Sequence, residues 1–533
     1  MAAIAGRPRA RVEQAPPRAA PRPIFQRERA IVGLLAAVTV ASRLPFLTPR
    51  LAHWDAVNYA LGLHDFNVAA HQPHPPGSPY FILLGRAALA ITGDDNAALI
   101  LVSLVASAGA VLSEYALARL LFGRSAALLA AIVLLSQPVF WGYGTMATAW
   151  TVLACLAIAI GLVCARMIHR PRASKIVIPS ALLLGFASGF RLDVTVFLGP
   201  LWLFAVWRAE PDPRRRLFAI ALVGAGVLVW LVPVADHSGG FDAWWERLVA
   251  LLPSTGAVAS QLATNTAISF GTLGFTLGPA LVLAAVSDWR KTLAFVRGCV
   301  QPFWVLWIAP AFVFLWLVDS TEPGHDLIFV GALCALGAAA IAHAAHRPTH
   351  TLIAGGLLVA AQAMVFVYAA PIYGRPLAWT ADAMLLNVTA PGLRQQQESL
   401  EAALRIVRTR LDPADTLVVT LTDQDPYRFM MYYLPEYTVV RLDRRADRVL
   451  VARDRRQSHW QPASGCPLAT DDAPERNAVW VVSAWSDVGL VSAGAQRAES
   501  VDAAPFQVWT QPIPADATEY AGITLRRGCG AAS

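Results

Sequence analysis

The residues best suited to chemistry lie in one stretch, residues 51–80, between two apolar segments. Asp55 follows Trp54 directly, and Tyr59 comes four residues later. Aromatic rings of this kind suit the interface between a membrane and water. A carboxylate held among them is expected to have a raised pKa, as a general base requires. The alternative interpretation of Asp55 is a solvated loop acid with no part in catalysis.

Several further groups that could bind a metal share this stretch with Asp55 and Asp65, namely His53, His64, His71 and His74. No pair of these histidines has the i,i+4 or His-x-His spacing that forms a metal site in advance. A divalent metal is therefore possible but not favoured. We expect no cofactor, and we assign the histidines to packing and hydrogen bonding.

Prolines and an apolar run follow the histidines. Pro73, Pro75, Pro76 and Pro79 predict a rigid, extended segment that re-enters the membrane surface. Residues 80–91 are apolar except for Arg86, and they are too few to span a bilayer. We therefore expect an interfacial helix there.

Two later turns also carry charged side chains beside apolar segments. The first, residues 185–193, ends with Arg191 and Asp193. These two residues either pair with each other or mark the turn, or else Arg191 binds an anionic lipid head group, since a guanidinium can hold two phosphate oxygens. The second turn, residues 319–326, contains acids and His325, and is either a solvated loop or part of a site.

The composition identifies the class of protein that must position these residues. Hydrophobic residues make up 56% of the 533, charged residues only 15%, and the formal net charge is +7. A soluble protein of this length would need about twice that charge. The basic residues lie in short clusters between apolar runs, which argues against nucleic-acid binding. Six cysteines show no CxxC pattern, so a structural zinc site is not expected.

The apolar runs predict about eleven transmembrane helices. The first begins near Ala30 and is interpreted as a retained helix, because no small-residue cleavage site follows it. The others are expected at residues 96–118, 125–140, 148–165, 176–190, 194–207, 217–235, 269–286, 301–318, 327–345 and 351–370. The proline-rich and arginine-rich residues 1–29 are expected to be a disordered tail.

The charge of the loops predicts the orientation. Five successive alternate loops carry most of the Arg and Lys residues, and the intervening loops carry almost none. The positive-inside rule then places the basic loops and the N-terminus in the cytoplasm. The transmembrane part is expected to cover residues 30–374, with a first outer loop at 48–79.

Residues 375–533 predict a separate extracytoplasmic α/β domain. Residues 392–411 have helical spacing of apolar side chains. Strands are expected at residues 416–421, 437–442, 449–452, 479–482 and 506–509. Cys466 and Cys529 lie in this domain, in a compartment where disulfides persist, so a bridge between them is a hypothesis.

This arrangement resembles the polytopic glycosyltransferases of the GT-C fold, in the branch of the protein O-mannosyltransferases and the lipid A aminoarabinose transferases. The resemblance rests on Trp54–Tyr59, on His74-Pro-Pro-Gly77, on the glycine-rich turn 185–200 and on residues 323–329. The sequence differs from the mannosyltransferase branch in one respect: Asp55 is followed by Ala56 rather than by a second acid. The sugar and the acceptor therefore stay open.

The resemblance implies transfer of a sugar from a polyprenyl-phosphate-linked donor to a lipid, glycan or protein acceptor on the outer side of a bacterial inner membrane, with inversion. Asp55 would be the base. Tyr59 and His74 would contact the substrate, and Arg191, with Arg86 and His325, would hold the phosphate. The alternative class is a transporter or flippase for a lipid-linked or small anionic substrate. Such proteins place charged sites near the bilayer midplane, often within internal repeats, which the sequence does not show.

Overall fold

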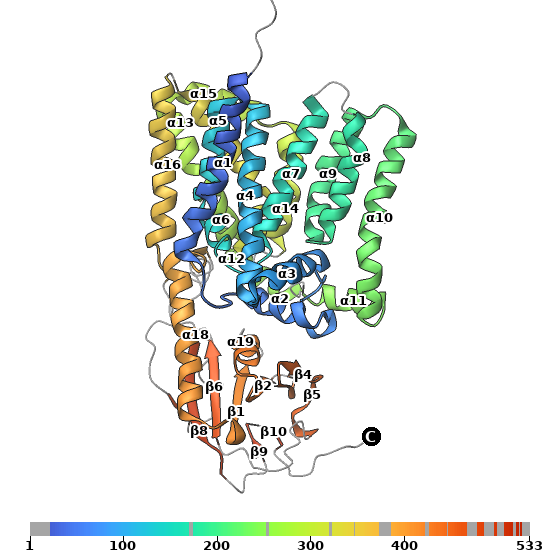
Figure 1. The fold of residues 1–533 in the computed structure, drawn as a ribbon, viewed down its shortest axis with the longest axis vertical. Helices are drawn as coiled ribbons and strands as arrows, with labels where there is room; N and C mark the ends of the chain where they lie inside the picture. Colours follow the sequence, from blue (N-terminus) through green and yellow to red (C-terminus); the bar gives the residue numbers. More distant parts are fainter. Residues whose placement is uncertain are drawn as a thin grey trace, which may run out of the picture.

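The protein has two stacked parts, a helical bundle and a smaller α/β domain (Figure 1). The computed structural model describes residues 22–169, 174–251, 255–318, 322–345, 347–371, 385–421, 426–444, 446–465, 477–483, 495–497, 506–514, 519–521 and 523–524. The bundle runs from α1 (Arg22–Arg43) to α16 (Pro348–Tyr368), and the second part starts at α18 (Ala390–Arg410). The expected boundary near residue 375 lies outside the described residues.

Each of the eleven expected apolar segments coincides with a helix. Besides α1 and α16, the bundle contains α4 (Asp95–Leu121), α5 (Arg124–Ser136), α7 (Trp150–His169), α8 (Ser174–Ser188), α9 (Leu192–Ala209), α10 (Pro213–His237), α12 (Thr255–Thr276), α13 (Gly278–Gly298), α14 (Pro302–Leu317) and α15 (Leu327–Ala344). The expected segment 269–286 falls across the break between α12 and α13, where the chain bends by 41°. The chain is thus a multi-pass membrane protein.

Fewer of the described helices are long enough to span a membrane than are present in the bundle. Seven of the described helices are long and apolar enough to cross a membrane, and the bent pair α12–α13 would make eight. Helices α5, α8 and α14 are apolar but have only 13, 15 and 16 residues. At 1.5 Å per residue they cover about 20–24 Å, less than the roughly 30 Å of a hydrocarbon core. The count of about eleven spans therefore stays a prediction.

The N-terminal tail is shorter than the sequence suggested. Helix α1 begins at Arg22, inside the stretch 1–29 that was expected to be disordered. Pro23 occupies the first turn, where its missing N–H costs nothing, and the residues after it favour a helix. Residues 1–21 lie outside the described part of the chain.

The first outer loop contains a helix of its own. Within residues 48–79 the structure places α2 (Trp54–His64), and the expected interfacial helix is present as α3 (Pro79–Thr92). Both lie at the end of the bundle, between it and the α/β domain (Figure 1). Two further short helices complete the bundle, α6 (Pro138–Tyr143) and α11 (Phe241–Val249).

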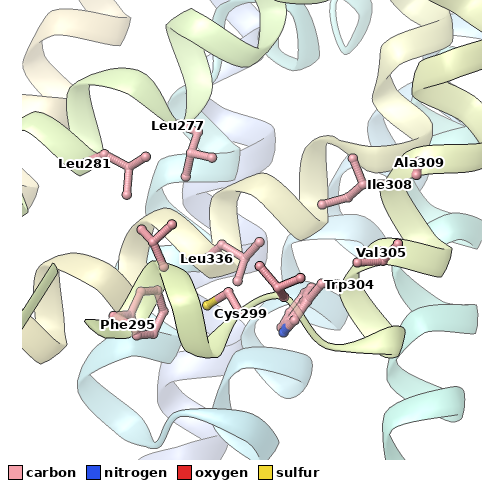
Figure 2. Close-up of a pocket in the computed structure, with 11 residues that line it drawn as sticks. Leu277, Leu281, Phe295, Cys299, Trp304, Val305, Ile308, Ala309 and Leu336 are labelled. Atoms are coloured by element: carbon pink, nitrogen blue, oxygen red, sulfur yellow. The ribbon is translucent and has the colours of Figure 1, made fainter. Parts of the chain in front are cut away.

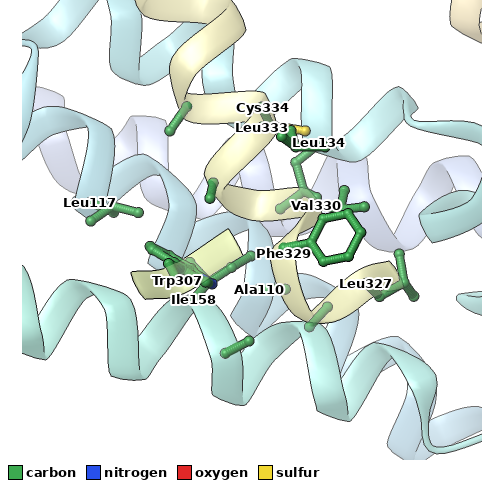
Figure 3. Close-up of a cluster of buried hydrophobic side chains, with 14 of the residues drawn as sticks. Ala110, Leu117, Leu134, Ile158, Trp307, Leu327, Phe329, Val330, Leu333 and Cys334 are labelled. Carbon is green, nitrogen blue, oxygen red and sulfur yellow. The ribbon is translucent and has the colours of Figure 1, made fainter. Parts of the chain in front are cut away.

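The centre of the bundle is a close-packed apolar core formed by α4, α5, α7, α14 and α15 (Figure 3). Trp307 of α14 is fully buried, and its indole N–H donates to the Ile328 carbonyl at 3.0 Å. A Cβ on Gly161 of α7 would lie 2.1 Å from the Trp307 ring. Only glycine therefore lets the two helices approach this closely.

The α/β domain contains one mixed sheet whose five expected strands are all present. They are β1 (Thr416–Leu421), β2 (Thr438–Asp443), β3 (Arg448–Arg453), β6 (Asn477–Ser483) and β8 (Phe506–Pro512). In the described residues the order is β4-β3-β2-β1-β6-β8-β7, with β1 parallel to both β2 and β6 and the other pairs antiparallel. Three short strands also belong to this sheet, namely β4 (Arg456–Gln457), β5 (Gln461–Pro462) and β7 (Gln496–Arg497). The strands β9 (Glu519–Tyr520) and β10 (Ile523–Thr524) form a separate pair. Cys466 and Cys529 lie outside the described residues.

The α/β domain is docked on the first outer loop. The Tyr432 hydroxyl of α19 (Pro426–Tyr433) donates to the Asp95 carboxylate at 2.6 Å, and the Leu51 backbone N–H donates to the Tyr433 hydroxyl at 2.9 Å. Arg428 and Gln457 both donate to the Ala70 carbonyl. These bonds, together with an apolar cluster shared by α2, α3 and α19, hold the first outer loop against the α/β domain.

Candidate active site

The N-terminus of α2 positions Asp55. His53 precedes the helix with extended backbone, and its Nδ1 accepts a hydrogen bond from the Asp55 backbone N–H at 3.1 Å. A carboxylate in the first turn is stabilised by the helix dipole. The Asp55 side chain is only 10% exposed, so it is enclosed by protein and is not the solvated loop acid that was the alternative.

The proline-rich segment brings His74 onto Asp55. His74 Nδ1 lies 3.2 Å from Asp55 Oδ1, and the His74 ring centroid lies 5.6 Å from that of Tyr59. Asp55 and Tyr59 are four residues apart, so they share one face of α2. Trp244 of α11 holds the segment from the other side, because its indole N–H donates to the Pro76 carbonyl at 3.2 Å. The segment that contains the paired prolines therefore lies against the Asp55 carboxylate.

The electrostatics of Asp55 differ from the sequence expectation, which was wrong. Burial raises the pKa of Asp55, but the charges of His74, His53 and Arg191 lower it, and the result is a pKa below the usual value. Burial also lowers the pKa of His74. Arg191 keeps its charge at neutral pH, and the lowered pKa of Asp55 leaves its carboxylate ionised there.

A second carboxylate lies behind His53. His53 Nε2 is 3.0 Å from Glu322 Oε1, and the Tyr143 hydroxyl donates to Glu322 Oε2 at 2.9 Å. Because Nδ1 of His53 accepts the Asp55 N–H, its proton resides on Nε2 and is donated to Glu322. Burial raises the pKa of Glu322, yet the contact with His53 brings it below the usual value. Glu322 therefore fixes the tautomer and orientation of His53.

Arg191 supplies the positive charge of the site. It precedes α9, and its Nε and Nη2 donate to the Asp193 carboxylate, the latter at 2.9 Å. The Arg191 side chain is 12% exposed, and its guanidinium lies 3.9 Å from the centroid of the Trp150 ring. Burial lowers the pKa of Arg191, but Asp193 outweighs that effect and raises it. Nη1 makes no hydrogen bond within the described residues, which leaves this edge for an anion.

His325 also contacts Trp150, from a short 3-10 helix (Pro323–Asp326) before α15. Its ring centroid is 4.5 Å from that of Trp150. A Cβ on Gly324 would lie 2.3 Å from Trp150, so glycine is required where this turn crosses the indole. Trp150 thus contacts both Arg191 and His325 and holds two segments that are far apart in the sequence.

The structure brings together five of the six residues singled out from the sequence, namely Asp55, Tyr59, His74, Arg191 and His325. The sixth, Arg86, has a different setting: its guanidinium donates to the carbonyls of Gly62 and Leu63 at the far end of α2. Because these carbonyls lie about two turns from Asp55, Arg86 is placed to position α2 rather than to bind a phosphate beside Asp55.

Three residues of the site were not identified from the sequence: Glu322, Tyr143 and Trp150. Tyr143 and Trp150 lie at the ends of apolar helices, where an aromatic side chain is an ordinary membrane anchor. Glu322 was one of several acids in its turn. The signal that distinguishes them is three-dimensional, namely their contacts with His53, Arg191 and His325.

No cluster of three or more metal-binding side chains occurs among the residues that the structure describes. The histidines of the loop instead have separate partners: His64 contacts the Asp95 carboxylate at 2.8 Å, His53 contacts Glu322 and His74 contacts Asp55.

Part of the chain matches a protein-family model. Residues 73–237, or 165 of the 533, match the family model described as dolichyl-phosphate-mannose-protein mannosyltransferase. A comparison with curated protein sequences gives no significant match. The matched segment includes His74, Tyr143, Trp150 and Arg191, so four of the residues at the site lie within it.

Two solved structures are similar over nearly the whole chain. ArnT from Cupriavidus metallidurans in the apo state has a TM-score of 0.57 at 14% identity, covering 91% of this chain and 98% of ArnT. The same protein bound to undecaprenyl phosphate has a TM-score of 0.53 at 14% identity, covering 92% and 98%. The chain therefore has the GT-C fold that its motifs indicated, with a C-terminal α/β domain.

Proposed function

We propose that this chain is a membrane glycosyltransferase that moves a sugar from a polyprenyl-phosphate-linked donor to an acceptor at the end of the bundle that carries Asp55. The observation that carries the proposal is an enclosed, ionised carboxylate near a permanently charged guanidinium with one free edge. The mannosyltransferase match and the shared fold support it, and the related ArnT structure is bound to undecaprenyl phosphate.

The reaction needs one base and one anion site. Asp55 accepts the proton from the acceptor hydroxyl or amine as its oxygen or nitrogen forms a bond to the anomeric carbon. The bond between that carbon and the phosphate oxygen breaks at the same time, and the electron pair leaves with the polyprenyl phosphate. Because this is a single displacement, the anomeric configuration inverts, as in inverting glycoside hydrolysis.

Arg191 stabilises the departing phosphate. A guanidinium matches two phosphate oxygens, and in a partly desolvated site its charge acts more strongly than in water. Asp193 holds Nε and Nη2, so the phosphate would meet the Nη1 edge, and His325, which also contacts Trp150, would assist. Tyr59 and His74 lie next to Asp55, where the sugar or acceptor must pass. No metal is needed in this scheme.

The orientation and partners follow from the same proposal. The basic loops lie at the opposite end of the bundle from Asp55, so the positive-inside rule places Asp55 and the α/β domain outside the cytoplasm of a bacterial inner membrane. The acceptor is a lipid, glycan or protein that reaches this face. The α/β domain, which contacts Ala70 of the first outer loop, would border the path by which the acceptor enters.

The experiment is mass spectrometry of the lipids that co-purify with the full-length protein. We expect polyprenyl phosphate, bare or glycosylated, with the wild type, and its loss with Arg191→Ala. Since Arg191→Ala leaves Asp193 buried without its partner, the double variant Arg191→Ala/Asp193→Ala serves as the folding control and should also lose the lipid.

Arg86→Ala is the matched control, because its guanidinium binds carbonyl groups of α2, and this variant should keep the polyprenyl phosphate. Only bulk phospholipid in the wild type and in every variant would contradict the donor site and favour the transporter class.

A further inference from the structure

Two adjoining cavities lie in one region of the bundle, at the end opposite Asp55. Asp55 lies near the first residues of α7, α9 and α15, whereas this region is lined by the last residues of α4 and α7 and the first residues of α14. Helix α7 alone has 20 residues, which separates the two ends by about 30 Å. A ligand here is therefore not part of the candidate active site.

The first cavity of the region is an apolar groove between α13, α14 and α15 (Figure 2). Its volume is about 320 Å³, and its walls include Leu281, Val305, Ile308, Ala309 and Leu336. Val305 is 45% exposed and Val300, at the rim, is 76% exposed, so the groove opens on the outer surface of the bundle. In a membrane that surface faces lipid, and the groove has the chemistry of a site for an acyl chain.

The second cavity adjoins the groove and is the more polar of the two, and we call it the polar cavity. It has a volume of about 430 Å³ and shares Phe295, Cys299 and Trp304 with the groove. Its other walls include His169, Gln301 and His343, which supply hydrogen-bond donors. An apolar groove that continues into a polar cavity has the shape of one lipid, with the chain in the former and the head group in the latter.

The charge around the polar cavity is positive. Arg297 directly precedes the lining residue Gly298, and Arg166 lies one turn before the lining residue His169 on the same face of α7. Within the described residues neither arginine pairs with a carboxylate. Arg119 is also near, but it is already paired with Glu28 at 3.7 Å. Arg166 and Arg297, which adjoin the walls of the cavity in the sequence, are therefore two cations that can neutralise a phosphate there.

The residues of helix α13 indicate that the two cavities lie near the membrane surface. Its backbone leaves the helical conformation at Asp288, and the segment beyond that residue carries Arg290, Lys291 and Arg297 together with exposed apolar side chains. Trp289 is 60% exposed and Leu293 is 41% exposed. Basic and exposed apolar residues on one segment are typical of a helix in the head-group region.

From these observations we propose that the two adjoining cavities form a binding site for one anionic glycerophospholipid of the leaflet opposite the active site. The acyl chain lies in the groove, and the phosphate lies in the polar cavity between Arg166, Arg297 and His169. Because the walls of the groove are uncharged, we expect the site to accept different acyl chains. Because the two arginines form no ion pair within the described residues, we expect it to prefer an anionic head group. Clusters of basic residues at a membrane surface attract anionic lipids.

The test is native mass spectrometry of the full-length, delipidated protein titrated with phosphatidylglycerol and, separately, with phosphatidylcholine of the same chains. We expect the first phosphatidylglycerol to bind at least fivefold more tightly than phosphatidylcholine. In Arg166→Gln/Arg297→Gln the preference should fall below twofold. Arg208→Gln is the control, since Arg208 is an exposed arginine in the last turn of α9 at the same end of the bundle.

A second variant tests the groove independently of charge. Ala309→Trp fills it and should weaken both lipids by a similar factor, whereas Ala221→Trp, on an exposed face of α10, should not. Equal affinity of the wild type for the two lipids would overturn the proposal. So would an unchanged preference in the double arginine variant, or full displacement of phosphatidylglycerol by equimolar polyprenyl phosphate.

Discussion

The outer end of the bundle and its centre are held together by different interactions. At the outer end, ion pairs and hydrogen bonds join segments distant in the sequence, such as His53 with Glu322 and Arg191 with Asp193. At the centre, apolar side chains pack closely around Trp307 and Gly161. Catalysis therefore depends on the outer end and stability on the centre, so substitutions should affect the two properties separately.

The largest effect on stability should come from the centre. Trp307→Ala removes a fully buried indole and leaves a cavity together with an unpaired Ile328 carbonyl, which should lower the free energy of unfolding by about 3 kcal/mol. Thermal unfolding in detergent measures the loss. The matched control is Trp289→Ala, because Trp289 is 60% exposed and its removal should change stability far less.

If the two regions act separately, Trp307→Ala should also keep its transfer activity. Sugar transfer per folded molecule of Trp307→Ala should remain within about threefold of the wild type. A loss of transfer activity out of proportion to the loss of folded protein would mean that the two regions are coupled.

The next effect is a pH dependence of stability at the outer end. Burial, with Arg428 and His74, lowers the pKa of His71 to about 3. Since an unfolded histidine has a pKa near 6.5, the unfolded state binds more protons below that value, and stability falls as the pH drops from 6.5 toward 3. We expect a loss of about 1–2 kcal/mol between pH 7 and pH 5 from this residue alone.

His71→Asn isolates that contribution. His71 has a φ of 57°, a left-handed conformation that asparagine tolerates. The variant should lose less stability than the wild type between pH 7 and pH 5, measured by thermal unfolding in matched buffers. Identical pH profiles for the two proteins would show that His71 does not titrate differently in the folded state.

How much of this could be predicted from the sequence differs between the two regions. The apolar runs located the long helices of the bundle but not the short helices α2, α6 and α11. Alternation of apolar residues located the five main strands. Both signals are local. The number of spans stayed open, since α5 and α14 are shorter than a bilayer requires. The start of α1 was misplaced because basic residues were taken as a sign of disorder.

The candidate site was predicted less completely, for a physical reason. Asp55, Tyr59 and His74 lie in one unusual stretch, so their types and spacing were informative. The pKa of Asp55 was expected in the wrong direction because the sequence gives no distance from its carboxylate to His74, His53 or Arg191, whose charges lower it. Glu322 was missed for the same reason.

The smallest effect should come from the exposed edge of the outer end. Arg50 contacts Glu401 of α18 at 3.3 Å, but the two side chains are 39% and 52% exposed. Exposed ion pairs contribute about 0–1 kcal/mol, so Glu401→Gln should change stability by less than 1 kcal/mol, and less still at high salt. A larger change in thermal unfolding would mean that this contact governs docking of the α/β domain.

The most direct test of the account is sugar transfer by Asp55→Asn in membrane vesicles supplied with the polyprenyl-phosphate-linked sugar that co-purifies with the wild type. Asparagine keeps the size of the side chain but cannot accept the proton. We expect transfer to fall by at least about 100-fold, while thermal stability and the co-purified lipid are retained. Transfer at the wild-type rate by this variant would contradict the assignment of Asp55 as the base.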